Sequence, residues 1–276
     1  VFHVSNLTVM KQTRLLPLVI ASLLILPPLT TDAQVGPGGV GNLTNTQLWL
    51  RSDSLIAIQP LYFITNWYDL SGHMRDFGAV VTGQTVPSLT LNVINGYPAV
   101  TFTDQGGAGG DFLGYNGSIG ITGSDAATVV IVARNTTAAD EQNGGLYMGQ
   151  KNAGGANAVR SYGLEYADAV RFNGQNQVFN DGHTLNNLKI VYYTNPAGAS
   201  VASYGAYLNG TALTGSSSSS FVPSLVSNFA LVGATQMNGS YNPAGYFNGD
   251  MMEIAVFSGQ LNDAERVVLH NNLGAK

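Results

Sequence analysis

The carboxylic acids of this chain are few, and their spacing bears on whether it can cleave a glycosidic bond. Its 276 residues contain four glutamates, which are Glu141, Glu165, Glu253 and Glu265. Glycoside hydrolysis uses two carboxyl groups about 5–10 Å apart on either side of the scissile bond. On a β-strand, two side chains share a face when they are two or four residues apart.

Two pairs of acids lie close together in the sequence, but neither has this spacing. Glu165 and Asp168 are three residues apart, and so are Asp250 and Glu253. Residues three apart point to opposite faces of a regular strand. The spacing favours a non-catalytic protein. Two carboxyl groups from distant strands could still form a catalytic pair, so a divergent glycosidase is the alternative.

Glu253 has two interpretations. It is either a functional carboxylate with a perturbed pKa, or a strand residue whose charge is satisfied by a neighbouring backbone N–H, arginine or tyrosine. A buried charge has to be paired in both cases, and we favour the second interpretation. In the same way we expect Asp69 to order the turn that follows Trp67 through its own backbone, and Trp67 to lie in the core.

A glycine-rich segment, 104–111, is the candidate for a metal site. It begins with Asp104 and ends with Asp111, with glycines between them. Calcium takes about 6–8 oxygen ligands, and carboxylates are among those it prefers. The sequence therefore offers Ca²⁺ as the one candidate cofactor, bound at Asp104 and Asp111. A plain surface loop and no cofactor at all is the alternative, because the spacing of the two acids matches no known calcium loop.

A carbohydrate site needs an aromatic side chain beside amide or carboxylate groups that form hydrogen bonds. Several tyrosines of this chain have asparagine or aspartate neighbours. The ligand-binding residues that we predict are Asp104, Asp111, Tyr115, Tyr162 and Tyr166. The alternative for each tyrosine is to pack in a strand with its hydroxyl in water, as is common in β-sandwiches.

Composition argues against several other classes of protein. The chain has no cysteine, which excludes disulfides, thiolate metal sites and cysteine nucleophiles. Its net charge is −5 without a basic run, so nucleic acid is not expected as a partner. Charged residues make up 10% of the chain, against about 25% in ordinary globular proteins. These features are typical of an extracellular β-protein, and a secreted chain of this size without cysteine is more typical of bacteria than of animals.

The first 33 residues are predicted to be a few upstream residues followed by a signal peptide. A positively charged stretch follows Met10, the expected start, and an apolar run over 15–29 leads to a cleavage site before Gln34. Prolines interrupt this run, whereas a transmembrane anchor needs about 20 apolar residues. We therefore expect a secreted or cell-surface protein without a membrane span in its mature chain. The mature part is predicted to be a linker over 34–46 and one domain over 47–276.

Many short strands are predicted in that domain. Apolar, β-branched runs at 128–134 and 188–194 predict central strands, and Asn209-Gly210 predicts a two-residue hairpin turn. About a dozen such strands with turn residues between them favour an all-β fold. We predict a two-sheet antiparallel jelly-roll sandwich of the concanavalin A-like type, with one short C-terminal helix.

A strand over 246–257 is expected to be apolar on both faces. Alternation of side chains divides its residues into two sets, with Met252, Ile254 and Val256 on one face and Met251, Ala255 and Phe257 on the other. A strand with two apolar faces is covered on both sides, so we expect to find it inside the fold.

A short amphipathic helix is expected to begin at Asn262. Asn262 and Glu265 have the spacing of a capping box, in which each residue hydrogen-bonds to the backbone of the other. Ala264, Val267 and Val268 share one face at helical spacing, and we expect this face to pack beside a sheet.

Five motifs follow one another in the order found in a known family. They are Leu48-Trp49-Leu50, Trp67-x-Asp69-x-Ser71-Gly72, Asn95-Gly96-x-Pro98-Ala99-Val100-Thr101-Phe102, Tyr207-Leu208-Asn209-Gly210 and Phe247-Asn248-Gly249-Asp250-x-x-Glu253-Ile254-x-x-Phe257. The chain thereby resembles the laminin-G-like jelly-roll domains of the concanavalin A-like lectin/glucanase superfamily, as in secreted surface proteins of Bacteroidetes-type bacteria. The resemblance implies two antiparallel sheets, one of them concave, with ligands at the rim or on the concave face. Relatives usually continue beyond this point, which implies a longer polypeptide.

These features together predict a non-catalytic extracellular binding or adhesion module, whose partner is a glycan or a cell-surface protein. The alternatives are a structural spacer within a larger secreted protein and a divergent glycoside hydrolase. The superfamily includes glucanases, which keeps the hydrolase open. Those glucanases resemble one another in a Glu-x-Asp-x-x-Glu strand, however, and this sequence lacks that motif.

Overall fold

The structure is a computed structural model, and it describes ten ranges of the chain. They are residues 36–56, 63–105, 109–136, 144–150, 158–165, 169–172, 177–180, 185–217, 220–237 and 243–276. All of them belong to one compact unit, residues 34–276. The predicted signal peptide, Tyr166 and Asp168 lie outside the described residues. In the described part of the chain, no helix is both long and apolar enough to cross a membrane.

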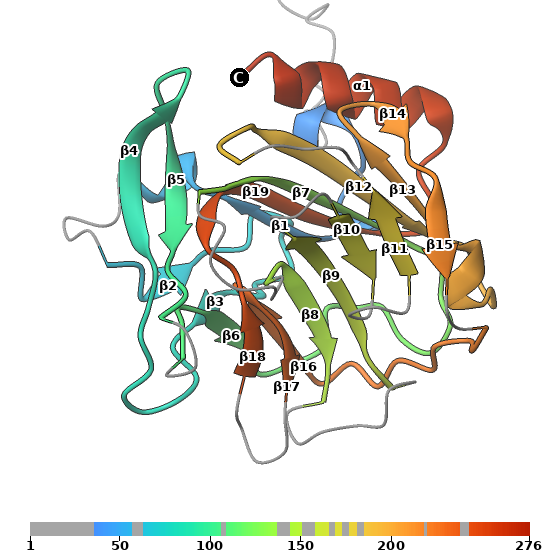
Figure 1. Cartoon of the computed structure of the whole chain (residues 1–276), viewed down its shortest axis with the longest axis horizontal. Coiled ribbons are helices and arrows are strands. Elements are labelled where there is room, and N and C mark those ends of the chain that lie inside the picture. Colours follow the sequence, from blue (N-terminus) through green and yellow to red (C-terminus); the bar gives the residue numbers. More distant parts are fainter. Residues whose placement is uncertain are drawn as a thin grey trace, which may run out of the picture. The chain divides into compact units, whose positions relative to one another are not determined.

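The first layer, called sheet A, has eight strands among the described residues (Figure 1). Neighbouring strands are antiparallel throughout. Their order is β14 (Thr211–Ala212), β13 (Gly205–Leu208), β12 (Lys189–Asn195), β7 (Ala127–Asn135), β19 (Gly249–Ser258), β5 (Tyr97–Phe102) and β4 (Ser88–Ile94). The remaining strand, β1 (Thr46–Arg51), also pairs with β19.

The second layer, called sheet B, has nine strands among the described residues. Their order is β15 (Gly215–Ser217), β11 (Gln177–Asn180), β10 (Ala169–Phe172), β9 (Arg160–Glu165), β8 (Leu146–Gly149), β16 (Phe229–Val232), β6 (Leu113–Tyr115), β3 (Phe77–Gly78) and β2 (Asn66–Trp67). A separate hairpin pairs β17 (Ala234–Met237) with β18 (Pro243–Tyr246). The helices are α1 (Asp263–Gly274) and the short 3-10 turns η2 (Pro37–Gly39), η3 (Asp53–Leu55) and η5 (Val201–Ser203). The predicted antiparallel sandwich with a C-terminal helix is confirmed.

The main core lies between the two sheets. Strand β7 contributes Val129 and Ile131 to it, and Trp67 is fully buried there, as expected. The opposite face of β7, with Val130 and Val132, packs in a second cluster that includes Leu269 of α1. Sheet A is therefore covered on both faces, which explains why its central strands are continuous apolar runs.

Strand β19 has a β-bulge, which puts two of its methionines on the faces opposite to those predicted. Its pairing with β7 shifts register between Met251 and Glu253. Because the bulge adds one residue, the alternation restarts after it. Met251, rather than Met252, joins Ile254 in the core between the sheets, and Met252 packs on the outer side. The predicted faces were therefore wrong for these two methionines, while those of the residues that follow were right.

Helix α1 begins as predicted but packs through a different face. Asn262 and Glu265 form the expected capping box. Val267 and Val268 are 58% and 45% exposed, whereas Leu269 and Leu273 are buried against sheet A. The two leucines are four residues apart and therefore share a face, and they bury more apolar surface than the valines would. Ala264 is exposed as well, so the prediction that Ala264, Val267 and Val268 face the sheet was wrong.

Several strand ends also differ from the prediction. The stretch 246–257 is interrupted, because β18 ends at Tyr246 and β19 begins at Gly249. Gly233, with φ of 87°, separates β16 from β17. Ser216 and Ser217 belong to β15. The hairpin at Asn209-Gly210 is confirmed, with φ of 47° and 83° at the two turn residues.

Candidate functional site: the Asp111 cleft

The predicted loop 104–111 is closed at its base by backbone pairing. Asp104 and Gly110 form an isolated antiparallel bridge. The backbone N–H of Asp111 donates to the carbonyl of Thr103 at 2.9 Å, and the N–H of Thr103 donates to Oδ2 of Asp111 at 2.9 Å. The Asp111 side chain is thus held back over the end of β5.

This pairing sends the two aspartates to opposite sides of the ladder. Asp111 lies opposite Thr103, and Asp104 lies opposite Gly110. Successive side chains along a strand alternate between faces, so Asp104 and Asp111 point apart. Burial raises the pKa of Tyr246, and the negative charge of Asp104 raises it further. Asp104 therefore lies near the Tyr246 ring. The two carboxylates therefore do not face each other, and the calcium site stays a prediction that would need one of them together with other oxygen ligands.

No larger group of acids supplies the missing ligands in the part of the chain that the structure describes. Among those residues, no cluster of three or more histidine, aspartate or glutamate side chains is arranged to hold a metal ion. Asp104 and Asp111 accordingly have to be considered one at a time.

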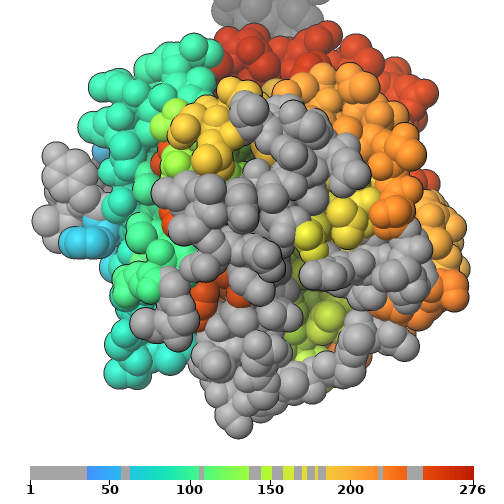
Figure 2. Space-filling view, viewed as in Figure 1, coloured from blue at the N-terminus to red at the C-terminus, as the bar shows by residue number. Residues whose placement is uncertain are grey.

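Asp111 lies in the wall of a cleft of about 410 Å³, which we call the Asp111 cleft. Its lining residues are Phe63, Gln84, Thr85, Val86, Ser88, Thr103, Gln105 and Asp111. They come from the segment before β4, from β4 itself and from the two sides of the loop after β5. The segments between 63 and 105, cyan to teal in Figure 2, form one side of the face shown there.

Two walls of the Asp111 cleft are fixed by hydrogen bonds. Oε1 of Gln84 accepts from the backbone N–H groups of Val80 and Val81, and its Nε2 donates to the carbonyl of Phe112 at 2.7 Å. The hydroxyl of Thr85 donates to the carbonyl of Gly110 at 3.0 Å. Gln84 uses its amide oxygen twice and one of its two amide N–H groups inside the fold, so its main role is to shape the cleft.

Phe63 is the aromatic residue of the cleft, and it is 64% exposed. Its backbone pairs with Ser88, and the next residue, Ile64, donates to the carbonyl of Pro87 at 2.7 Å. A large apolar ring held at the surface by its own backbone is available for stacking. The sequence analysis missed Phe63, because its exposure becomes visible only in the structure.

Asp111 is almost buried, with 8% of its surface exposed. Burial raises the pKa of this carboxyl, and the hydrogen bond from the backbone N–H of Thr103 opposes that effect. Desolvation penalises the ionised form of an acid. Asp111 therefore combines a fixed position with a carboxyl group that holds its proton more tightly than an exposed aspartate does.

The arrangement suits a ligand with one apolar face and several hydroxyl groups. Phe63 supplies a ring, while Ser88, Gln105 and Asp111 supply hydrogen-bonding groups around it. Small-molecule sites are typically concave, with a few polar groups that orient the ligand. Among the residues predicted for binding, Asp111 lies in this cleft and Asp104 faces away from it.

The predicted tyrosines lie elsewhere. Tyr115 is half-buried in β6, with its ring 6.0 Å from that of Phe77. Tyr162 is fully buried in the core, where its ring lies 5.2 Å from Phe172 and 5.1 Å from Tyr193. A ring without an exposed face cannot stack on a sugar, so Tyr162 is removed from the predicted set. Tyr166 lies outside the described residues.

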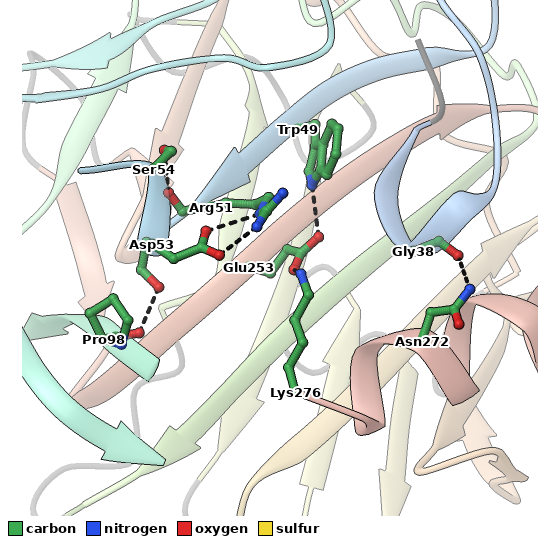
Figure 3. Close-up of polar contacts among 10 residues, drawn as sticks. Gly38, Trp49, Arg51, Asp53, Ser54, Pro98, Glu253, Asn272 and Lys276 are labelled. Carbon is green, nitrogen blue, oxygen red and sulfur yellow. Dashed lines mark hydrogen bonds and ion pairs between the residues drawn. The ribbon is translucent and has the colours of Figure 1, made fainter. Parts of the chain in front are cut away.

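Glu253 is paired inside the fold, as we expected, but its partners are a tryptophan and a lysine in place of the expected backbone N–H, arginine or tyrosine (Figure 3). Its Oε1 accepts from the indole Nε1 of Trp49 at 2.7 Å, and its Oε2 lies 3.0 Å from Nζ of Lys276. The residue is buried. Both carboxylate oxygens therefore have partners, which agrees with the second interpretation of Glu253, a strand residue whose charge is satisfied inside the fold.

Asp250 lies on the same face of sheet A as Glu253, which corrects the expectation from their spacing. Asp250 is paired in register with Thr101 and Arg134, and its carboxylate accepts from the Thr101 hydroxyl at 2.6 Å and from Nε of Arg134 at 2.7 Å. The bulge in β19 brings Glu253 to that face too. Both acids are nonetheless buried and held by partners.

Asp69 orders its turn as predicted. Its carboxylate accepts from the N–H of Ser71 at 2.9 Å, from the Ser71 hydroxyl at 2.7 Å and from the N–H of Arg75 at 3.1 Å. It also accepts from the N–H of Trp49 at 3.0 Å, which ties the turn to β1. Four hydrogen bonds within the fold give Asp69 the structural role that we expected.

Comparison with known proteins identifies the fold. No family model matches the sequence, and no curated protein is significantly similar to it. Solved structures are similar in fold. The binding domain of botulinum neurotoxin serotype C1 has a TM-score of 0.54 and 14% identity, over 84% of this chain and 52% of that chain. An arabinofuranosidase solved with arabinofuranosyl-α-1,2-xylobiose has a TM-score of 0.56 and 15% identity, over 77% of this chain and 51% of that chain.

A further neighbour is the binding domain of botulinum neurotoxin DC in complex with rat synaptotagmin II. Its TM-score is 0.51 at 14% identity, over 84% of this chain and 52% of that chain. This chain thus spans about half the length of these structures. The likeness defines the fold class, a two-sheet antiparallel sandwich.

Proposed function

We propose that this chain is an exported, non-catalytic binding module of the laminin-G-like group, and that it takes carbohydrate in the Asp111 cleft. The observation that carries the proposal is the exposed ring of Phe63 beside Ser88, Gln105 and the nearly buried Asp111 in one cleft of about 410 Å³. A pyranose ring has an apolar C–H face and a rim of hydroxyls. It would stack on Phe63 and hydrogen-bond to the polar side chains.

The state of the acids supports binding without hydrolysis. Asp250 and Glu253 share a face of sheet A, but each is buried and held by a cation and a neutral donor. Hydrolysis needs two opposed carboxyl groups with the scissile bond between them. Asp111 stands in the cleft without a second acid among the described residues that line it. A single carboxyl group suits recognition of hydroxyls.

The fold neighbours support binding in a general way. Botulinum neurotoxin type C depends on interaction with two ganglioside molecules to enter cells, and the neurotoxin DC domain was solved with synaptotagmin II. These statements concern those proteins. They indicate that a sandwich of this fold can serve as a binding domain for glycan or for protein.

A glycan array combined with a reducing-sugar assay tests the proposal. We expect the protein to bind a defined subset of oligosaccharides and to release no reducing ends from them. Binding that is weakened when Phe63 is replaced would assign it to the Asp111 cleft. Turnover of a bound glycan would establish the hydrolase instead. Retention of a cell-surface protein, with no glycan bound, would favour the protein partner.

A further inference from the structure

A second hollow lies at the opposite edge of sheet A from the Asp111 cleft. It is a groove of about 550 Å³ between α1 and the β13–β14 hairpin, which we call the hairpin groove. Its walls include Tyr207, Asn209, Thr211, Asp263, Arg266 and Asn271. In the sheet order, β14 is the terminal strand at one end and β4, which borders the Asp111 cleft, is at the other. Figure 1 shows α1 running beside β14.

The hairpin side of the groove is rigid. Oδ1 of Asn209 accepts from the N–H of Ile190 at 2.9 Å, and the N–H of Asn209 donates to the carbonyl of Ile190 at 2.9 Å. Asn209 and Gly210 both have positive φ, as a tight two-residue turn requires. With its oxygen engaged, Asn209 keeps its amide NH₂ group as the donor that it can offer to a ligand.

The helix side of the groove is fixed and electrically balanced. The guanidinium of Arg266 lies 4.3 Å from the ring centre of Tyr207, and Nη2 donates to the Tyr207 hydroxyl at 3.2 Å. The same guanidinium pairs with Asp263 and donates to the carbonyl of Leu261. Because the arginine and the aspartate that line the groove neutralise each other, neither an anion nor a cation gains net attraction there.

The groups that remain accessible in the groove are polar and uncharged overall, and they surround a small apolar surface. The Asp263 side chain is 94% exposed, and Thr211 and Asn271 are also exposed. Val267 is exposed too and lines the same groove. Nδ1 of His270 has no hydrogen-bond partner among the described residues. No hydrogen bond at this nitrogen therefore selects one tautomer of the ring.

We infer that the hairpin groove is a second ligand site, for a neutral, hydroxyl-rich molecule of the size of a sugar residue. The hydroxyls of such a ligand would accept from the amide of Asn209 and donate to the carboxylate of Asp263. Thr211 and Asn271 can do both, and the C–H face of the ligand would lie on Val267. A volume of about 550 Å³ falls within the range of roughly 300–1,000 Å³ that is usual for small-molecule sites. This site does not depend on the Asp111 cleft.

Saturation-transfer NMR on the full chain tests the inference. The probes are methyl β-D-glucopyranoside, methyl β-D-galactopyranoside and methyl α-D-mannopyranoside, with N-acetylneuraminic acid and glucosamine as charged probes. The protein carries Phe63→Ala, which silences the Asp111 cleft. We expect saturation transfer to at least one neutral glycoside, with an affinity that added salt does not change, because a neutral ligand is not screened.

The double variant Thr211→Val/Asn271→Leu removes two hydrogen-bonding groups from exposed positions. We expect it to weaken binding about tenfold or more while the far-UV CD spectrum is unchanged. The matched control is Asn228→Leu, which removes an amide outside the groove and should bind as before. The inference is overturned if no neutral glycoside receives saturation, if only a charged probe does, or if the folded double variant binds as tightly as its parent.

Discussion

Two nearly buried carboxylates of this molecule, Glu253 and Asp111, have opposite surroundings. Glu253 is engaged on both oxygens, by the Trp49 indole and the Lys276 ammonium group. Asp111 accepts from the backbone N–H of Thr103, lacks a cationic partner among the described residues, and borders an open cleft with an exposed ring. Burial alone therefore does not distinguish a structural acid from a functional one. The two acids differ in whether the carboxyl group can still form hydrogen bonds and whether it borders an open cleft.

The largest effect should come from replacing Glu253. Glu253→Ala leaves the Trp49 indole and the Lys276 ammonium group without their acceptor, and losing one partner of a buried pair is strongly destabilising. We expect a loss of about 2–3 kcal/mol in the free energy of unfolding, reduced from the fully buried case because the Lys276 side chain is 28% exposed. Urea unfolding followed by CD measures it.

The control for this variant is Asp263→Asn. Its carboxylate also pairs with a cation but is almost fully exposed, so the loss should stay below about 1 kcal/mol. Equal losses in the two variants would contradict the structural role of Glu253.

Phe63→Ala should weaken ligand binding and leave the stability of the protein almost unchanged. Its ring is largely exposed, so the free energy of unfolding should change by less than about 0.5 kcal/mol. Affinity for a glycan found on the array should fall about tenfold, which corresponds to about 1.4 kcal/mol. Isothermal calorimetry gives the affinity. Met74→Ala, which truncates an exposed side chain outside the cleft, should leave binding intact, and a similar loss there would remove Phe63 from the site.

Asp111 should produce a dependence of stability on pH that Asp111→Asn lacks. Burial raises the pKa of Asp111 above its ordinary value of 3.8. Between 3.8 and the raised value the folded state holds a proton that the unfolded state releases, so this residue's contribution to stability falls as the pH rises. Urea midpoints from about pH 4 to pH 7 measure this contribution as the difference between the parent and the variant, and we expect that difference to fall as the pH rises. A difference that rises with pH would contradict the raised pKa.

Removal of calcium should have the smallest effect. Asp104 and Asp111 point to opposite faces of the loop ladder, so we expect the same Tm in EDTA and in added calcium. A Tm that rises with calcium in the parent protein but not in Asp104→Asn would show that Asp104 binds the ion with ligands other than Asp111.

Local patterns that depend on neighbouring residues could be predicted from the sequence. The strand at 128–134 is buried on both faces, the hairpin at Asn209-Gly210 forms, and Asn262 and Glu265 make their capping box. Each depends on residue types within a few positions. Strand β4 escaped prediction because Leu89 is its only buried residue, which leaves no alternation to detect.

Features that depend on partners far along the chain could not be predicted. The bulge at Met252 arises from the pairing of β19 with β7, and the face of α1 is chosen by what sheet A offers to Leu269 and Leu273. The Asp111 cleft brings Phe63 next to residues that are distant in sequence. Asp111 was found because a glycine-rich loop with flanking acids drew attention to it. Phe63 was missed because an isolated phenylalanine usually belongs to a core.

The extra residue in β19 also affects how variants of this protein should be compared. Deleting Met252 would restore an unbroken two-residue repeat, because Met251 and Glu253 already pair with consecutive residues of β7, Ala133 and Val132. Met251 would keep its place between the layers, and Asp250 would keep its outward position beside Arg134. When natural versions of this chain are compared, a gap at this position should therefore need no compensating exchanges, whereas a gap elsewhere in the strand would exchange the faces of the residues on one side of it.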